Sequence, residues 1–574
     1  MASRFIFTAA PERSIVSSGL RVLAALLLTI TLMMALLYSG YIEYTSFEPA
    51  KYGDGDAEVG APEVDLSGRK VTFEKSSMAR EGHLWRRSLR GTPEEIGAAS
   101  GALSGRLYAK IDERLGAMVR QRYGQGIEAW AEHMLLRWDY RATTNALRLD
   151  DQRELSAMIE ALPPVRQGGL SVYERLHLMQ CMVDVTQRLD DFLIEGVTFA
   201  AVPSKTSASS DRGNVLVGRS LSVDLGDDFD ADRIVSFYYP DGKYPFVSVG
   251  WAGLVGVVTG VNARGVFVAI NPARTDDSPE NGRALTIVAR QILEEADNLE
   301  SALKLLDTIT LRSSGILTIA DGFSRRAVVV EMSPGGKDDR RVIRGDGSPM
   351  VWATDHMIRE VFERDAHNER LARATSSGSR FDRLGELLPS NGMMSVADAI
   401  RVLRDRKGVG GRPLGLANKA ALENLRTTHA VVVDLSAMVM WVSEGPSGIG
   451  RFQSFDLRRE LGRSDRPPAP LDDYPPDPLL YSETFYDLQT ARQEVLHATR
   501  LLQAGDREQA LTSARIALAL APDLGELHRL LGDIERDLGH YEAAVEHYRR
   551  YLELVPGRER DQEVVRGIIQ EIGG

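Results

Sequence analysis

An uncharged run of 21 residues, from Val22 to Ile42, constrains this chain more than any other sequence feature. A helix needs roughly 20 apolar residues to cross the hydrocarbon core of a bilayer, so the run is long enough to span a membrane. Positive residues precede it and acidic residues follow it: Arg4, Arg13 and Arg21 on one side, Glu43 and Glu48 on the other. Because Lys and Arg are enriched on the cytoplasmic flank, we expect residues 1–21 in the cytoplasm, a transmembrane helix at residues 22–42, and the rest of the chain outside the cytoplasmic membrane.

A cleaved signal peptide is the alternative for the same segment. The apolar core of a signal peptide is usually about 7–15 residues long and ends in a small-x-small cleavage site. The run in this chain is longer, and Ala35-Leu36-Leu37 is a poor cleavage site. The sequence therefore favours an uncleaved anchor.

Composition excludes several classes of protein for the remainder of the chain. Hydrophobic residues make up 43% and charged residues 26%, which is ordinary for a globular protein. The formal net charge is -12 and no Lys/Arg-rich block interrupts it, so the electrostatic footprint of a nucleic-acid-binding protein is missing. A single cysteine excludes an intramolecular disulfide and a multi-cysteine metal cluster. We expect no cofactor and no metal.

That single cysteine, Cys181, has two interpretations. His177 and Asp184 stand at i−4 and i+3 spacing from it on a predicted helix, which would suit an activated nucleophile. Apolar residues also surround it, and a free cysteine in such a helix is usually a small buried apolar residue. We favour the second interpretation.

The order of helical and extended patterns predicts the domain organisation. Residues 43–82 are polar and without sustained period, which is typical of a stalk. Apolar residues then recur at helical spacing as far as Leu193, and β-branched runs punctuated by Gly, Pro and Asn begin at Val197. Strand blocks separated by helix blocks predict an α+β layered domain over residues 89–455, rather than a doubly wound parallel sheet.

The C-terminal part of the chain contains a repeat. A proline-dense segment, residues 463–481, predicts a semi-rigid linker. Residues 488–574 then repeat with a period of 34, which is the period of tetratricopeptide helix pairs. The matched pairs are Gly505 and Gly539, Glu508 and Glu542, Ala510 and Ala544, Leu518 and Leu552, and Pro522 and Pro556. Such an array predicts a protein partner in its concave face, or only a packed cap.

Eight segments between Gly91 and Gly450 resemble, in order and spacing, the isopenicillin N acyltransferase family, kin of acid ceramidase and bile-salt hydrolases. The segments read RGTPEEIGAASGAL, GVTFAAVPSK, VLVGRSLSVD, WAGLVGVVTGVNARGVFVAINPAR, LTIADGFSRRAVVVEMSP, ATDHM, SRFDRL and HAVVVD. The resemblance implies a four-layer αββα sandwich of the N-terminal-nucleophile type. In that family a precursor is cut before a cysteine, whose new α-amine is the general base and whose thiol attacks an amide or ester.

This sequence departs from the family pattern at three positions. The cysteine position falls on Gly196, or on Val197 if one residue is skipped, and neither side chain can act as a nucleophile. The family's orienting carboxylate corresponds to Ser222, and its second active-site Asn corresponds to Asp355. Together these departures predict loss of the standard mechanism.

Three further residues match the family pattern, and with Asp355 they are our candidate site residues: Arg219, Asn271 and Arg380. The resemblance gives Asn271 the role of oxyanion stabiliser. If they line one pocket, they form a donor-rich site suited to a carboxylate or amide oxygen. Each residue also has a structural alternative: Arg219 pairs with Asp224 or Asp227, Asn271 holds a turn before Pro272, and Arg380 is an ion-pair partner at a helix start.

Thr198 is the remaining candidate nucleophile. It lies on the same face of its strand as Gly196, and a cut before it would create an N-terminal Thr with its own amine as base. That amine would lie about 6–7 Å from the family position, and Ser222 would leave it without an orienting carboxylate.

Three functional hypotheses follow from the sequence. The first is a membrane-anchored, catalytically degenerate acyltransferase-like domain that binds an acyl- or amide-bearing ligand, or serves as a structural module, and whose repeats contact a protein partner. The second is an active linear-amide hydrolase or acyltransferase that uses Thr198. The third is a scaffold whose tetratricopeptide repeats bind a protein partner.

Overall fold

The computed structural model describes most of the 574 residues. The described ranges are 13–46, 60–65, 69–123, 130–131, 134–135, 137–138, 141–164, 170–186, 194–206, 213–223, 229–277, 281–334, 341–390, 392–462, 471–555 and 559–573.

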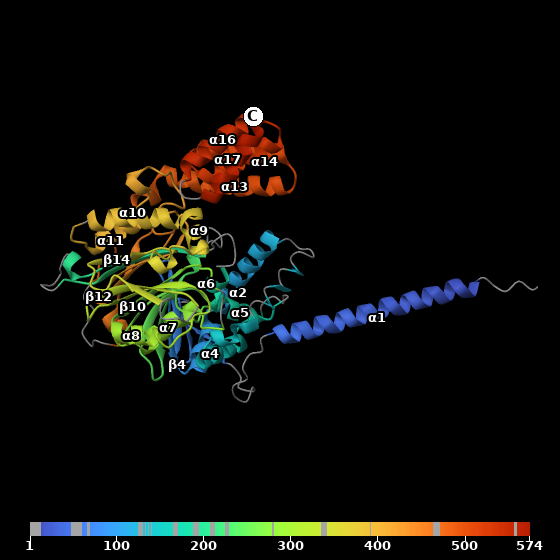
Figure 1. Cartoon of the computed structure of the whole chain (residues 1–574). Helices are drawn as coiled ribbons and strands as arrows, with labels where there is room; N and C mark the ends of the chain where they lie inside the picture. Colours follow the sequence, from blue (N-terminus) through green and yellow to red (C-terminus); the bar gives the residue numbers. More distant parts are fainter. Residues whose placement is uncertain are drawn as a thin grey trace, which may run out of the picture.

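Two β-sheets form the centre of the middle domain (Figure 1). Sheet A has eleven strands in the order β1-β2-β3-β4-β7-β8-β9-β10-β11-β12-β13, and sheet B has six in the order β14-β5-β6-β15-β16-β17. The strands of sheet A are β1 (Glu63–Val64), β2 (Lys70–Phe73), β3 (Ser76–Glu81), β4 (Leu84–Gly91), β7 (Ile234–Pro240), β8 (Phe246–Gly250), β9 (Thr259–Asn262), β10 (Val266–Pro272), β11 (Gly315–Asp321), β12 (Arg326–Met332) and β13 (Arg341–Arg344). Those of sheet B are β5 (Ile194–Ala201), β6 (Leu216–Val223), β14 (Met350–Ala353), β15 (Thr427–Asp434), β16 (Val439–Ser443) and β17 (Phe452–Asp456). Of these pairings, β4 with β7 is parallel.

Helices cover the outer faces of both sheets. The outer face of sheet A packs against α2 (Pro93–Tyr123), α4 (Leu149–Glu160), α5 (Val172–Gln180), α6 (Met182–Thr186), α7 (Leu285–Glu295) and α8 (Leu299–Leu306). That of sheet B packs against α10 (Ser377–Ser390) and α11 (Val396–Leu403), with α9 (Ala366–Ala374) beside α10 and the short α12 (Leu457–Glu460) after β17. The predicted α+β class and its αββα layers are confirmed.

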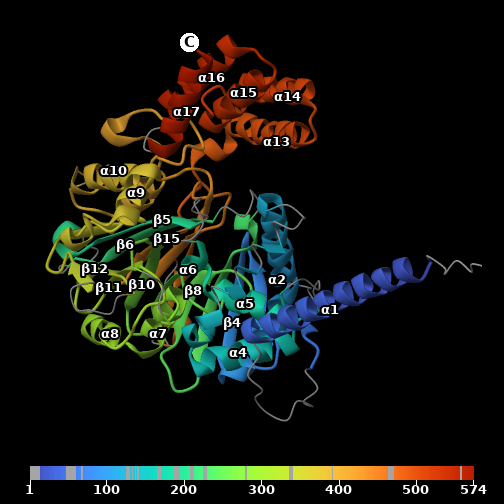
Figure 2. The same cartoon turned by 45° about the vertical axis from the view of Figure 1, so that its right-hand side comes forward.

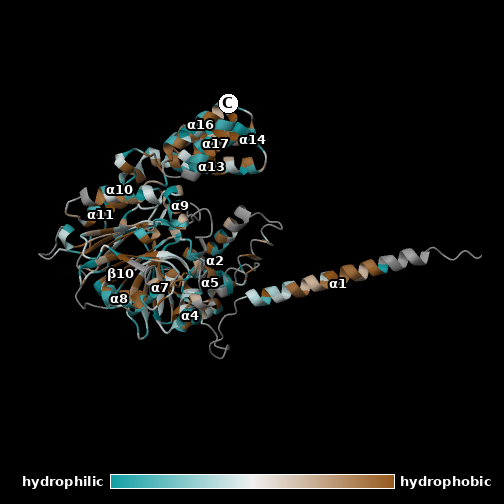
Figure 3. Ribbon diagram, in the orientation of Figure 1, coloured by the Kyte–Doolittle hydropathy of each residue, from teal (hydrophilic) through white to brown (hydrophobic). Residues whose placement is uncertain are grey.

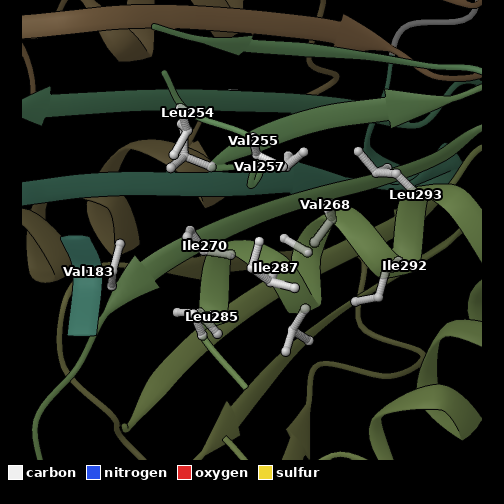
Figure 4. Close-up of a cluster of buried hydrophobic side chains, with 14 of the residues drawn as sticks. Val183, Leu254, Val255, Val257, Val268, Ile270, Leu285, Ile287, Ile292 and Leu293 are labelled. Carbon is white, nitrogen blue, oxygen red and sulfur yellow. The ribbon is translucent and has the colours of Figure 1, made fainter. Parts of the chain in front are cut away.

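Strand β10 shows how the layers are built. Val268 and Ile270 point outward onto α7, where they meet Ile287 and Leu293 (Figure 4). The alternate residues Phe267 and Ala269 point inward and pack in the core between the sheets. Because strand side chains alternate in this way, Asn271 also faces sheet B.

Residues 70–81 differ from the predicted stalk over residues 43–82. They form β2 and β3, which extend sheet A beyond β4, and Phe73 and Met78 are buried. The prediction is wrong here because the two strands are short and mostly polar, with few residues on the buried face. Half of the proline-dense segment also contacts the domain, since Tyr474 exchanges backbone hydrogen bonds of 2.9 and 3.0 Å with Phe452. Residues 463–470 lie outside the described residues.

The N-terminal helix α1 (Arg13–Thr45) extends away from the folded body, with the body at its C-terminal end (Figures 1 and 2). Its stretch Arg21–Thr45, brown over much of its length in Figure 3, is long and apolar enough to cross a membrane. Most of its apolar side chains are exposed. A signal sequence near the N-terminus would have the same character.

The C-terminal part consists of α13 (Glu483–Gln503), α14 (Arg507–Leu520), α15 (Gly525–Asp537), α16 (Tyr541–Leu554) and α17 (Glu559–Ile572). Gly505 and Gly539 end the first helix of each pair in the left-handed region, with φ of 85° and 81°. Ala510 and Ala544 are fully buried where the helices cross. The helices pack on the middle domain, where Phe485 and Leu488 of α13 join Leu425 and Ile449 in one apolar cluster.

Candidate functional site

Four strands and one helix bring the candidate residues together. In sheet B, Thr198 of β5 pairs with Arg219 of β6 on one side and with Ala353 of β14 on the other. Asp355 follows the end of β14, and Arg380 lies in the first turns of α10. Asn271 reaches the same point from sheet A, because it lies on the inward face of β10.

The carboxylate of Asp355 is the centre of the site. It accepts two hydrogen bonds from the backbone N–H of Gly196, at 2.9 Å to Oδ1 and 3.1 Å to Oδ2. It also accepts from Nδ2 of Asn271 at 3.1 Å and forms an ion pair with Arg380 at 2.9 Å. Arg380 binds a second carboxylate, that of Glu195, at 2.9 Å. Sequence reasoning had not included Glu195, although it directly precedes Gly196.

Arg219 closes the other side of the site. Its Nη1 donates to Oγ1 of Thr198 at 2.9 Å and to Oδ1 of Asn271 at 2.8 Å, and its Nη2 donates to the carbonyl of Ile270 at 2.5 Å. The Thr198 hydroxyl donates to Oδ1 of Asn271 at 3.0 Å. Each polar side chain is therefore held by another member of the group.

We call these five side chains the buried network: Thr198, Arg219, Asn271, Asp355 and Arg380. All of them are at most 3% exposed. Burial raises the pKa of Asp355 to about 6, against the opposing effect of Arg380. Burial also lowers the pKa of Arg219 to about 10, although Asp355 opposes this. For Arg380, the carboxylates of Glu195 and Asp355 outweigh burial and raise the pKa. Two positive groups, Arg219 and Arg380, thus share the network with one carboxylate, Asp355, and Glu195 beside Arg380 adds a second carboxylate.

Gly196 has no room for a side chain. A Cβ atom at this position would lie 2.5 Å from Nη1 of Arg219 and 3.0 Å from Nδ2 of Asn271. A Cβ atom essentially never comes within 3.0 Å of a non-bonded heavy atom, so Arg219 would have to move. The space that a side chain at residue 196 would enter is occupied by the network.

The structure gives a different result for each structural alternative proposed for Arg219, Asn271 and Arg380. Asp224 and Asp227, the expected partners of Arg219, lie outside the described residues. Asn271 lies within β10 rather than in a turn. Arg380 does form ion pairs near the start of a helix, as that alternative required.

Cys181 is remote from the network. It is fully buried at the break between α5 and α6, in the core beneath sheet A. Burial lowers the pKa of His177 to about 4, and Nε2 of that ring contacts the carbonyl of Thr143 at 2.9 Å. Asp184 accepts a hydrogen bond from Ser313 at 2.5 Å. These contacts are those of core residues, which agrees with the interpretation we favoured.

Among the described residues, Asp276, Asp365 and His367 form a group with metal-ligand spacing, their ligand atoms lying within 4.8 Å of one another. Asp365 is the N-cap of α9 and accepts from the backbone of Asn368 at 3.0 Å. Asp276 accepts from the backbone of Ala366 at 3.1 Å and also binds His367. Asp365 and Asp276 therefore cap the N-terminus of α9.

A cavity of about 510 Å³ lies between α13 and one end of sheet B. Its lining includes Thr427 and Thr428 of β15 and Gln489 and Gln493 of α13. No member of the buried network lines it.

Two family models match parts of this chain. Residues 228–447 match the acyl-coenzyme A:6-aminopenicillanic acid acyl-transferase family, and residues 495–559 match the tetratricopeptide repeat. The middle of the chain is acyltransferase-like, and its C-terminus carries tetratricopeptide repeats. The acyltransferase match includes Asn271, Asp355 and Arg380 but begins after Arg219.

Individual relatives are distant. The Caenorhabditis elegans ortholog of N-acylethanolamine-hydrolyzing acid amidase is 15% identical over 42% of this chain and 93% of that chain, with a TM-score of 0.29. A mutant of the conjugated bile acid hydrolase from Clostridium perfringens is 12% identical over 47% and 95%, with a TM-score of 0.32. An uncharacterized protein of Archaeoglobus fulgidus is 28% identical over 143 residues, so the chain spans about a quarter (24%) of that relative. The assignment depends on the matched families and not on these likenesses.

Proposed function

We propose that this chain is a membrane-anchored protein whose acyltransferase-like domain no longer cleaves amide bonds and instead holds the tetratricopeptide repeats outside the membrane for a protein partner. The observation that carries the proposal is the position of Gly196. Its N–H donates to Asp355, and Arg219 and Asn271 fill the space that a side chain at this position would enter.

The chemistry of nucleophilic catalysis supports this proposal. An N-terminal nucleophile needs a free α-amine as base and a thiol or hydroxyl that reaches the substrate. In the uncut chain the nitrogen of Gly196 belongs to a peptide bond and donates to Asp355, and a glycine offers no thiol or hydroxyl that could cut the bond before it or attack a substrate. Thr198 has a hydroxyl, but it is fully buried and bound by Arg219 and Asn271.

The strand pairing also argues against Thr198 as an N-terminal nucleophile. Strand β5 pairs with β6 along its whole length, from Ile194 to Ala201, and with β14 from Thr198 to Ala201. A cut before Thr198 would divide this strand in its middle. Residues 194–197 would then be free to leave the sheet, with loss of the Gly196–Asp355 contact.

A ligand site is a second candidate function, favoured by the cavity of about 510 Å³. Small-molecule sites are typically cavities of about 300–1,000 Å³ and are common where domains meet. The amide and hydroxyl groups of Gln489, Gln493 and Thr428 line it and would suit an acyl- or amide-bearing ligand. Such a ligand would contact the tetratricopeptide helix α13 and sheet B together.

An activity assay tests the main proposal. The full-length protein is incubated with N-acyl amino acids and acylated amines, and release of free amine is followed. We expect no release above the rate in buffer. Release that is abolished in Thr198→Val would instead establish the enzyme that uses Thr198.

A reporter fusion tests the anchor. In a bacterial host, a phosphatase fused after residue 60 should be active, because residues 43–574 are proposed to lie outside the cytoplasmic membrane. Activity of only a cytoplasmic reporter at the same point would contradict this topology.

A further inference from the structure

The last turns of α1 end against aromatic side chains of the folded body. The ring of Tyr38 stacks on Trp130 with 6.3 Å between centroids, and Tyr41 stacks on Trp138 at 6.3 Å. Tyr44 also contacts Trp138, at 5.9 Å. Three tyrosines spaced three residues apart on one helix thus meet two tryptophans from a segment about ninety residues further along the chain.

A buried arginine of this segment, Arg137, binds the end of α1. Arg137 is 5% exposed; its Nη2 lies 2.7 Å from the carboxylate of Glu174 in α5 and 2.7 Å from the hydroxyl of Ser46, just after α1. The hydroxyl of Tyr41 also donates to the carbonyl of Met134. The position of the tryptophans relative to the helix is therefore set by polar contacts as well as by ring stacking.

The apolar side chains of the segment remain exposed in spite of these contacts. Trp130 is 51% exposed, Leu135 is 59% and Trp138 is 44%. Two charged residues stand between Trp130 and Trp138: Glu132 lies outside the described residues, and Arg137 is turned inward. Large exposed apolar groups held in fixed positions usually mark a surface that binds something.

The position of the segment along the membrane-spanning helix indicates that its partner is lipid. At about 1.5 Å per residue, the 21 residues from Val22 to Ile42 extend roughly 30 Å, the thickness of a bilayer core. Tyr38, Tyr41 and Tyr44 then lie at the outer boundary of that core. Trp and Tyr are enriched at this boundary, where an apolar ring meets polar headgroups.

We infer that these side chains form an interfacial membrane contact, which we call the aromatic shelf: Tyr38, Tyr41, Tyr44, Trp130, Leu135 and Trp138. The shelf enters the headgroup region of the outer leaflet and holds the folded body against the bilayer. The guanidinium of Arg141 lies 3.9 Å from the centre of the Trp138 ring, where it can meet a lipid phosphate. This inference rests on the proposed membrane anchor.

Tryptophan fluorescence in lipid vesicles tests the inference. The chain has six tryptophans, of which Trp251 is 1% exposed and the shelf holds two. The full-length protein is placed in phosphatidylcholine vesicles whose acyl chains carry bromine close to the headgroup, because bromine quenches nearby tryptophans. We expect quenching in the wild-type protein and loss of most of it in the double variant Trp130→Phe, Trp138→Phe.

A matched control is Trp441→Phe, which replaces a tryptophan of sheet B that is bound through Nε1 to the carbonyl of Asp472 at 3.1 Å. This variant should keep the bromine-dependent quenching. Equal melting temperatures of the three proteins would exclude misfolding as the cause of a difference.

Alkaline carbonate washing separates failure of the shelf from failure of the anchor. Protein that leaves the vesicles on washing would contradict the anchor itself. Protein that stays, with quenching unchanged in the double variant, would overturn the shelf and leave the anchor intact. Quenching lost only in the double variant supports both.

Discussion

The backbone nitrogen of Gly196 lies 2.9 Å from Oδ1 of Asp355. The two residues are 159 positions apart in the chain, and their contact joins β5 to the segment between β14 and α9. In an N-terminal-nucleophile enzyme the nitrogen at the corresponding position would be a free amine. In the uncut chain the nitrogen belongs to a peptide bond, and the carboxylate that accepts its hydrogen bond is paired with Arg380.

Gly196→Ala should destabilise the protein by about 1–3 kcal/mol, the usual cost of adding a group to a filled core. Its new Cβ would lie 2.5 Å from Nη1 of Arg219. Chemical denaturation measures the change in the free energy of unfolding. Gly385→Ala is the control, because a Cβ there would lie at an ordinary 3.5 Å from Trp352 and Ala suits a helix better than Gly. Equal effects of the two substitutions would show that the space beside Gly196 is open.

Arg380→Met should cost about 3–5 kcal/mol, because it leaves the carboxylates of Asp355 and Glu195 without their buried partner. Arg373→Met removes an exposed ion pair with Glu369 and should change stability by less than about 1 kcal/mol. Thermal unfolding of both variants checks this. Lost ligand affinity with an unchanged melting temperature in Arg380→Met would instead indicate a binding role.

Arg219→Met should also lower the melting temperature. Thr198 and the carbonyl of Ile270 would each lose a donor in a fully buried position, at about 1–3 kcal/mol for each unsatisfied group. The double variant Arg219→Met, Thr198→Val removes both partners of one hydrogen bond, so its cost should be less than the sum of the single costs. Strict additivity would contradict the direct contact.

Asp355 should make the folded protein less stable as the pH rises from about 4 to about 6. Burial raises its pKa to about 6, whereas an Asp in an unfolded chain titrates near 4. Between these values the folded protein holds a proton that the unfolded chain has lost, so raising the pH lowers the free energy of unfolding, by about 3 kcal/mol at most. The melting temperature of Asp355→Asn should therefore improve relative to wild type across this interval. Asp184, whose pKa burial also raises to about 6, is present in both proteins and cancels. Parallel curves would contradict the prediction.

Local patterns in the sequence predicted much of the fold. The run HAVVVDL became β15, the 34-residue period became two helix pairs, and alternation placed Gly196 and Thr198 on one face of β5. Strand β4 escaped detection because Arg86, Arg87 and Arg90 interrupt its apolar pattern. Arg87 is nevertheless 2% exposed, since Ser104, Ser236 and Tyr238 accept its hydrogen bonds. Partners so far away in sequence cannot be inferred from the strand itself.

The residues of the candidate site were predictable from the sequence, but the contacts among them were not. The resemblance identified Arg219, Asn271, Asp355 and Arg380, and the structure joins them in one network. Which carboxylate faces residue 196 depends on how β14 and β5 pair, so the role of Asp355 could not be derived from its neighbours in the chain. The same pairing explains why Glu195 was missed as a partner of Arg380.

The intact mass of the purified full-length protein tests the central claim most directly. Self-processing at the family position would break the covalent link between the anchor and the rest of the chain and create a new N-terminus at Gly196 or Thr198. We predict one species that includes the uncut β5 strand, both freshly purified and after prolonged incubation. A fragment that begins at Gly196 or Thr198 would contradict the account, and one that begins at Thr198 would establish an N-terminal-nucleophile enzyme instead.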